Sequence, residues 1–221
     1  MNRFYVVFVA LAVALGAVLI YMLTAAPGGG SRAAAGTPAT VVDDGFRGYT
    51  LGSDSAPVEI TEYGDFECPA CASFATIQMP TIKNQLIATG KVRWRYRDFP
   101  LAMHAYARLS AHAAQCGGEQ GKFWEMHDQL FANHSWAQTG RDPSQLFRDM
   151  ARAVGLDVGR YDDCMSSGRY ASRIEFSRRE GEERLVNGTP TFFINGAQYT
   201  GRSNSDAVKR AVDSVIAARG R

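Results

Sequence analysis

Cys68-Pro69-Ala70-Cys71 stands between a segment with the pattern of a β-strand and a segment with the pattern of a helix. Upstream, residues 58–63 are rich in β-branched and aromatic side chains and begin with an alternation of apolar and polar residues. Downstream, apolar residues recur at helical intervals over residues 72–89. Cys68 is therefore expected at the N-cap of a helix, where free backbone amides and the helix dipole favour a thiolate over a thiol.

The two cysteines are expected to divide the chemistry between them. Pro69 suits the first position of the helix, because its missing N–H group is not needed there. Cys71 lies one turn further on, where it faces the protein interior and can form a disulfide with Cys68. We expect an exposed Cys68 that is attacked and a sheltered Cys71 that resolves the mixed disulfide.

A C-x-x-C pair by itself is also half of a zinc site, so a second motif is needed. Gly188-Thr189-Pro190 supplies it, because a Thr-Pro bond directly before a short hydrophobic strand is unusual for a residue that cannot donate to a β-ladder. No second C-x-x-C and no nearby C-x-x-H provides the remaining zinc ligands. The sequence favours a redox dithiol, with no metal and no other cofactor.

The order of these features resembles the thioredoxin fold of the DsbA-like thiol-disulfide oxidoreductases, from about Phe46 to the C-terminus. The order is strand, C-P-x-C, helix, long helical insertion, T-P, strand, N-G turn, strand, helix. The resemblance implies an α/β fold in which Pro190 is cis and packs against the dithiol. It also implies that Thr189 offers backbone groups to a substrate, which Pro69 and Ala70 contact as well.

The same family keeps an acidic residue six positions before the first cysteine, which falls on Glu62. The alternation of Glu62 with Val58 and Ile60 directs its side chain to an apolar face, where loss of hydration raises the pKa of a carboxyl group. Glu62 is thus the candidate proton carrier for Cys71. The alternative is a carboxylate at the strand end in contact with water.

The N-terminal residues 1–26 have the composition of a membrane or signal segment. No charged residue occurs from Phe4 to Leu23, a length that matches the hydrocarbon core of a bilayer. We expect an uncleaved signal anchor in a bacterial inner membrane, with a flexible linker at 27–45 and the thioredoxin-like domain at 46–221 on the periplasmic or extracytoplasmic side. A cleaved signal peptide, which would leave a soluble periplasmic protein, is the alternative.

Residues 103–186 form the expected helical insertion, with helices at 105–116, 120–133, 143–154, 158–167 and 172–185. Cys116 and Cys164 fall in different helices, and in an exported chain they are expected to form a structural disulfide. The alternative is a second redox pair that relays electrons to Cys68 and Cys71. The four histidines, His104, His112, His127 and His134, lack metal-ligand spacing and are expected to be ordinary helix or capping residues.

The charge pattern excludes a nucleic-acid-binding role. Residues 91–97 alternate charged and apolar side chains, which predicts a strand whose arginines form a solvated face, and the formal net charge of the chain is only +2. The expected partners are instead proteins with exposed cysteines, together with a quinone-linked membrane partner that reoxidises the dithiol. A monomer is expected. The related isomerases dimerise through an added N-terminal domain, which the short linker cannot supply, so an oxidase is favoured over an isomerase.

The direction of electron flow is the open question in the sequence. The family's strong oxidants have a histidine where this chain has Ala70, and Asp65 and Glu67 flank the sulfur instead. Both differences are expected to destabilise the Cys68 thiolate relative to those oxidants. An oxidase is favoured, with a reductase or isomerase as the alternative. A chaperone or binding module would not need both cysteines.

Overall fold

A computed structural model of the chain describes residues 12–18 and 41–219. Residues 12–18 are helical, and within the described ranges no helix has both the length and the apolar character needed to cross a bilayer. The rest of the expected signal anchor and most of the expected linker lie outside the described residues. The chain divides into a unit at Met1–Ala39 and a unit at Thr40–Arg221, and the second unit carries the fold described below.

A five-stranded mixed sheet forms the centre of this unit, in the order β1-β3-β2-β4-β5. Its strands are β1 (Tyr49–Leu51), β2 (Val58–Gly64), β3 (Val92–Asp98), β4 (Thr191–Ile194) and β5 (Ala197–Tyr199). Only β2 and β3 pair in parallel. The tight turn between β4 and β5 is made by Asn195 and Gly196, both with positive φ, as the Asn-Gly sequence predicts.

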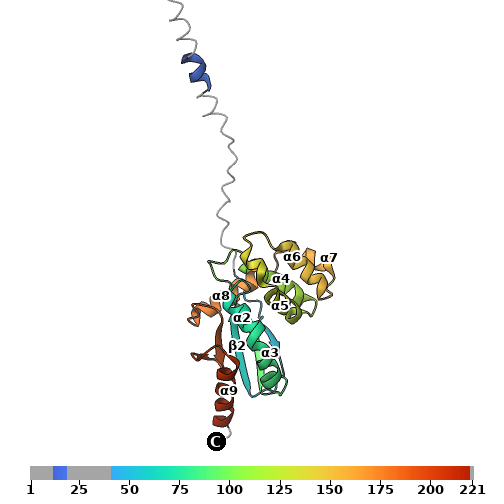
Figure 1. Cartoon of the computed structure of the whole chain (residues 1–221), viewed down its shortest axis with the longest axis vertical. Helices are drawn as coiled ribbons and strands as arrows, with labels where there is room; N and C mark the ends of the chain where they lie inside the picture. Colours follow the sequence, from blue (N-terminus) through green and yellow to red (C-terminus); the bar gives the residue numbers. More distant parts are fainter. Residues whose placement is uncertain (1–11, 19–40, 220–221) are drawn as a thin grey trace, which may run out of the picture. The chain divides into compact units, whose positions relative to one another are not determined.

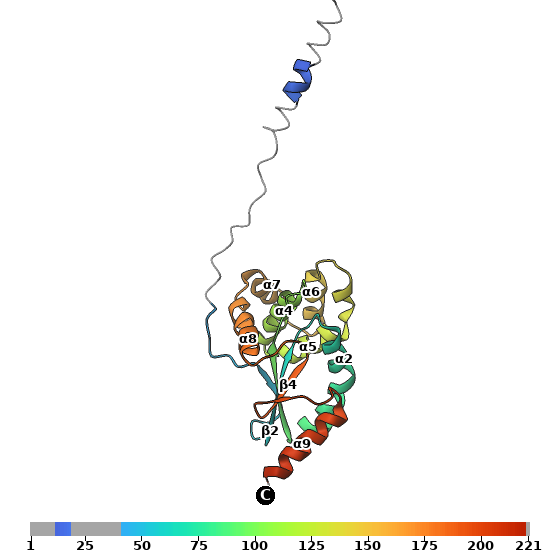
Figure 2. The same ribbon diagram turned by 90° about the vertical axis from the view of Figure 1, so that its left-hand side faces the viewer.

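One face of the sheet is covered by the helix after the dithiol and by α9 (Ser205–Arg219), which Figures 1 and 2 show running beside the strands. The first of these is built from α2 (Pro69–Ser73), the π-helical turn η1 (Phe74–Gln78), α3 (Met79–Ile82) and a second π turn η2 (Lys83–Ile87). Val58, Ile60, Trp94 and Val208 belong to the core between these layers.

The helical intervals expected over residues 72–89 give a helix, and π turns interrupt it at residues 74–78 and 83–87. Pro80 has no N–H group to donate to the preceding turn, and the amide of Met79 bonds the carbonyl of Phe74, five residues back. Ile77, one of the apolar residues of this pattern, lies inside the first π turn and is 63% exposed.

The helical insertion lies at one end of the sheet (Figure 2). It consists of α4 (Ala107–Glu119), α5 (Phe123–Ala132), the 3₁₀ turn η3 (His134–Gln138), α6 (Ser144–Ala153), α7 (Val158–Ser167) and α8 (Ala171–Glu183). A disulfide joins Cys116 of α4 to Cys164 of α7, with both cysteines buried and their Cα atoms 5.8 Å apart. The disulfide therefore cross-links two helices in a core that the insertion shares with Phe66, Cys71 and Tyr96.

The second face of the sheet carries the arginines of β3, and it is less solvated than the sequence suggested. Arg93 and Arg95 both pair with Glu59 of β2. Arg97 is only 2% exposed, because it pairs with Glu180 of α8 and donates to the carbonyl of Phe46. The sequence predicted solvated arginines because the residues that pair with them are distant in the sequence and cannot be identified from local pattern.

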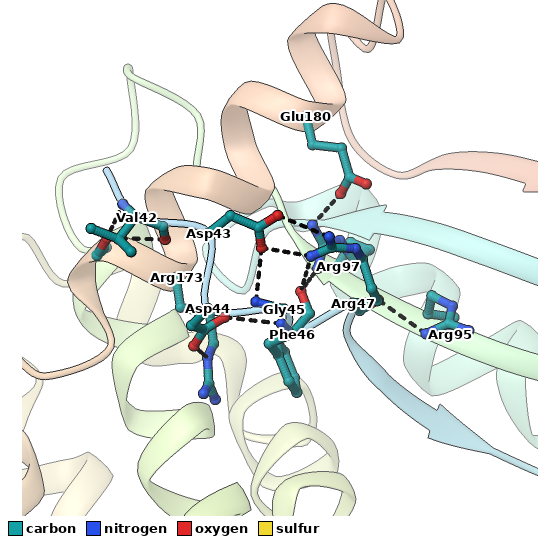
Figure 3. Close-up of polar contacts among 11 residues, drawn as sticks. Val42, Asp43, Asp44, Gly45, Phe46, Arg47, Arg95, Arg97, Arg173 and Glu180 are labelled. Atoms are coloured by element: carbon teal, nitrogen blue, oxygen red, sulfur yellow. Dashed lines mark hydrogen bonds and ion pairs between the residues drawn. The ribbon is translucent and has the colours of Figure 1, made fainter. Parts of the chain in front are cut away.

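Residues 42–47, which we call the strap, lie across α8 and β3 (Figure 3). The amide of Val42 donates to Ser172 Oγ at 2.7 Å, and Asp44 forms an ion pair with Arg173 at 2.7 Å. Asp43 accepts from the amide of Gly45 and pairs with Arg47. The C-terminal end of the segment expected as a flexible linker is thus attached to the domain by specific hydrogen bonds.

The disulfide of the insertion gives the first prediction. Because it closes a loop with a sequence separation of 48, the Cys116→Ala/Cys164→Ala variant should lose about 4 kcal/mol of unfolding free energy in the chain-entropy account. Denaturant unfolding of the oxidised proteins measures this. The single Cys116→Ala variant, which also lacks the cross-link, serves as the matched control and should be destabilised similarly. A double variant as stable as the wild type would contradict a structural role and favour the relay.

Candidate functional site

The dithiol lies at the carboxyl end of β2, where the chain turns from the sheet into α2. Cys68 is the N-cap of α2 in an extended conformation, and Pro69 occupies the first turn. The Cys68 amide donates to the carbonyl of Asp65 at 3.1 Å, which closes the turn that positions the sulfur. Cys68 is 6% exposed and Cys71 0%. Cys68 alone reaches the surface, although through a narrower opening than the sequence suggested.

The Thr-Pro motif comes from the other end of the chain to meet this sulfur. The bond between Thr189 and Pro190 is cis, and Cys68 Sγ lies 3.4 Å from the carbonyl oxygen of Thr189. In the thiol form of Cys68, the S–H group donates to that carbonyl. The two motifs singled out in the sequence therefore form one surface, 121 residues apart in the chain.

The two sulfurs are electrostatically unlike. The pKa of Cys68 is lowered to about 5, first because the Cys71 thiol hydrogen-bonds its sulfur, and then through the Thr189 side chain and the amides of Cys71 and Ala70, while burial opposes these effects. Burial raises the pKa of Cys71 well above its ordinary value, and the hydrogen bond and charge of Cys68 raise it further. At neutral pH the arrangement supports a thiolate at Cys68 beside a protonated Cys71.

Glu62 lies on the dithiol side of the sheet, as its alternation in β2 predicts. Its side chain is buried, with the residue 3% exposed, and Trp94 Nε1 donates to its Oε2 at 3.0 Å. Burial raises the pKa of this carboxyl to about 7, which the hydrogen bond from Trp94 partly opposes. The charge of Glu62 contributes to the raised pKa of Cys71. A proton on Glu62 is therefore exchangeable at neutral pH, close to the buried thiol.

Asp65 and Glu67 accept hydrogen bonds from a loop that is distant in the sequence, a role that the sequence did not indicate. Asp65 Oδ2 accepts from the amide of Leu101 at 2.9 Å and contacts His104 Nδ1 at 2.7 Å. Glu67 Oε2 accepts from the amide of Tyr106 at 2.6 Å. Both carboxylates thus hold the loop 99–106 against the turn before Cys68. Nothing in the local sequence around His104 distinguishes this role from that of an ordinary capping residue.

The structure also bears on the metal interpretation. Among the described residues, the one group of three potential ligands is His112, Cys116 and Cys164, whose donor atoms lie within 4.8 Å of one another. Both of its sulfurs are joined in the disulfide. His112 Nε2 contacts the Cys164 carbonyl at 3.1 Å. The dithiol of Cys68 and Cys71 belongs to no such group within the described ranges.

Comparison with known proteins gives a consistent picture. The profile of a family described as Thioredoxin matches residues 47–214. The Na(+)/H(+) antiporter NhaA 3 of Salinispora tropica is 36% identical over 207 residues, which cover 90% of this chain and 30% of the antiporter. The chain thus spans about a third of the length of that curated relative.

Two further relatives are similar in length to the matched region. The probable disulfide bond formation protein D of Bacillus anthracis is 25% identical over 170 residues, covering 76% of this chain and 77% of that protein. The crystal structure of oxidised BdbD from Bacillus subtilis superposes with a TM-score of 0.65 at 23% identity, covering 76% of this chain and 92% of that one. The second likeness shows the fold.

The buried carboxyl gives the second prediction. Because the pKa of Glu62 is raised from an ordinary 4.5 to about 7, the neutral carboxyl stabilises the fold fully below pH 4.5, and this stability is lost as the pH rises through 7. The loss is about 3 kcal/mol. The side chain of Glu62→Gln stays neutral at both pH values. Between pH 4.5 and pH 8.5 the unfolding free energy of this variant should therefore fall by about 3 kcal/mol less than that of the wild type.

The measurement is denaturant unfolding of the reduced proteins at both pH values. Comparing the change with pH removes any constant cost of the substitution. Asp213→Asn is the matched control, because Asp213 is an exposed carboxylate whose pKa is lowered by Lys209. Parallel pH curves for wild type and Glu62→Gln would show that Glu62 is ionised throughout the range.

Proposed function

This chain belongs to the thioredoxin family, and from that premise we propose that it is a thiol-disulfide oxidoreductase that introduces disulfides into exported proteins. The observation that carries the proposal is the contrast at the dithiol. The pKa of Cys68 is lowered to about 5, whereas the pKa of the buried Cys71 is raised. A sulfur with a low pKa is a good leaving group, so a mixed disulfide at Cys68 is readily resolved toward the substrate.

The oxidised enzyme starts with a bond between Cys68 and Cys71. A substrate thiolate attacks Cys68 Sγ, the Cys68–Cys71 bond breaks, and Cys71 leaves as a thiolate that takes a proton from neutral Glu62. A second substrate thiolate then attacks the substrate sulfur of the mixed disulfide and releases Cys68 as a thiolate. The substrate has lost two electrons to the dithiol and gained one disulfide.

The substrate is proposed to be an extended segment that lies beside Thr189, with Pro69 and Ala70 forming the other side of the contact. The Thr189 carbonyl already faces Cys68 Sγ at 3.4 Å, so a chain that bonds covalently to this sulfur passes the backbone of the Thr-Pro motif. Extended, cysteine-containing segments of unfolded proteins fit this geometry without a closed pocket.

Oxidation is favoured over reduction because both carboxylates next to the sulfur are bound by hydrogen-bond donors. Asp65 accepts from Leu101 and His104, and Glu67 accepts from Tyr106, so these donors offset part of the negative charge near Cys68. They therefore oppose the thiolate less than their sequence positions suggest. The name of the Bacillus anthracis relative, a probable disulfide bond formation protein, supports the same direction.

The proposed location is the extracytoplasmic side of a bacterial inner membrane. Two features support it: the uncharged run from Phe4 to Leu23, and the buried disulfide between Cys116 and Cys164, a type of bond that persists in oxidising compartments. A membrane partner that passes electrons to quinones would regenerate the disulfide, and the protein would act as a monomer. A reductase or isomerase of the same fold remains the second candidate.

The test is oxidation of a reduced, unfolded substrate protein that has two cysteines. The oxidised wild type should form one substrate disulfide per dithiol reduced. Cys71→Ser has no second thiol for the active-site disulfide, so it is first converted to a mixed disulfide of Cys68 with glutathione; a substrate thiolate should then displace glutathione and form a covalent complex through Cys68. Cys68→Ser should form neither complex nor product, because the attacked sulfur is missing. Non-reducing electrophoresis and thiol titration follow these species. A wild type that leaves this substrate reduced but opens the disulfide of its oxidised form would be a reductase.

A further inference from the structure

Three buried polar atoms near the dithiol have no hydrogen-bond partner within the described part of the chain. They are Glu62 Oε1, Tyr96 Oη and Asp98 Oδ1. In the parallel register of β2 and β3, Glu62 pairs with Tyr96 and Gly64 pairs with Asp98. Because side chains alternate along a strand, these positions share one face of the sheet. The three unpaired atoms therefore belong to neighbouring side chains.

Gly64 allows the phenol of Tyr96 to lie along this row. A Cβ atom at position 64 would be 2.7 Å from Tyr96 Oη and 2.6 Å from the nearest ring carbon. The Tyr96 hydroxyl thus lies over Gly64, the residue paired with Asp98. Consistent with this placement, burial raises the pKa of Tyr96, and the charges of Asp98 and Glu62 are the next largest contributions. Both carboxyls are therefore near the phenol.

Asp98 is held in place from the helical insertion. The amide of Gln115 donates to Asp98 Oδ2 at 2.7 Å, while Gln115 Oε1 accepts from Arg173 at 3.2 Å and from the Tyr49 hydroxyl at 3.3 Å. Arg173 in turn pairs with Asp44 of the strap (Figure 3). Asp98 is 4% exposed, and burial raises its pKa to about 6. Its second oxygen is left for a partner on the dithiol side.

We propose that Asp98 is a second proton-holding carboxyl of the redox site, which exchanges a proton with Glu62 through the hydroxyl of Tyr96. In the exchange, Tyr96 gives its proton to the Glu62 carboxylate and receives the proton of neutral Asp98. Glu62 becomes neutral, Asp98 becomes charged and the phenol is unchanged. One water molecule or a small shift of either carboxyl completes the path, because each of the three oxygens has a free hydrogen-bonding position.

This role rests on the proposed function, because Glu62 is the group that supplies the proton to Cys71. After that transfer, a carboxylate is left in an apolar environment beside the sulfur, which is unfavourable. A protonated Asp98 can restore the neutral form of Glu62 without direct access of bulk water. Asp98 touches no reacting atom, so it is a positioning residue that acts through Glu62.

The ionisable surroundings of the pair come from several elements. They are Glu62 of β2, Asp65 of the following turn, Cys71 of α2, Arg97 of β3, His127 of α5, Tyr49 of β1 and Arg173 of α8. Burial lowers the pKa of His127, which favours the neutral form of its ring. Glu62, with a pKa raised to about 7, and Asp98, with a pKa raised to about 6, change charge between pH 5 and 8, whereas Cys71, whose pKa is raised well above its ordinary value, stays protonated.

The test follows the rate at which a small thiol reduces the oxidised full-length protein, as a function of pH. Two carboxyls that share protons titrate as a pair, which raises the apparent pKa at which the last proton leaves. Asp98→Asn keeps the shape and the bond to Gln115 but holds no exchangeable proton. The apparent pKa of proton donation to Cys71 should fall by about half a unit or more, which lowers the rate about three-fold at pH 8.

Tyr96→Phe is the second variant, and it removes only a hydroxyl without a partner in the described part of the chain, so folding should be retained. It should lower the apparent pKa of proton donation to Cys71 by the same amount as Asp98→Asn. The double variant should show no larger decrease than either single variant. Asp213→Asn is the charge-matched control and should behave as the wild type. Wild-type pH profiles in both variants, whatever their stability, would overturn the proposal. A wild type that does not exchange with thiols would overturn the proposed function and this inference with it.

Discussion

The hydrogen bonds that converge on Cys68 Sγ at the start of α2 are the interaction on which the rest of the site depends. They lower the pKa of Cys68 to about 5 from an ordinary 9.0. At pH 7 such a displacement stabilises the reduced form by about 3 kcal/mol, which corresponds to a rise in reduction potential of about 60 mV. The cis Thr189–Pro190 loop and the turn closed by Asp65 hold the sulfur in this position. The proposed oxidase activity follows from this stabilised thiolate.

Beside this thiolate, burial raises the pKa values of several groups and so favours their neutral forms. Cys71, Glu62 and Asp98 are all buried, and each has a raised pKa. Burying carboxyls in an apolar core lowers stability once they ionise, so their presence here is better explained by proton exchange than by packing. The insertion contributes to this part of the site, because Gln115 of α4 holds Asp98. The disulfide between Cys116 and Cys164 joins α4 to α7, and Gln115 of α4 holds the carboxyl of Asp98.

The sequence predicted those features that depend on local pattern. Cys68 at the N-cap, Glu62 on the apolar face and the Asn195-Gly196 turn all follow from spacing and residue type. Ion pairs and hydrogen bonds with distant partners could not be predicted from local pattern. Arg97 was expected in water because its partner Glu180 is 83 residues away. The role of Asp98 was missed because this residue lies at the end of a regularly alternating strand and no local feature marks it. The π turns escape periodicity analysis because they change the period itself.

The most direct test of the account is the reduction potential of the Cys68–Cys71 pair, measured by equilibrating the full-length protein with glutathione buffers. A stabilised Cys68 thiolate, without the histidine that strong oxidants have at the position of Ala70, predicts a value between about −270 mV, as in thioredoxin, and about −120 mV, as in the strongest oxidants of this fold. Cys116 and Cys164 should stay oxidised throughout the titration, so the transition should involve two electrons. A potential at or below that of thioredoxin would contradict the account, because the thiolate would then not be stabilised enough to make the dithiol an oxidant.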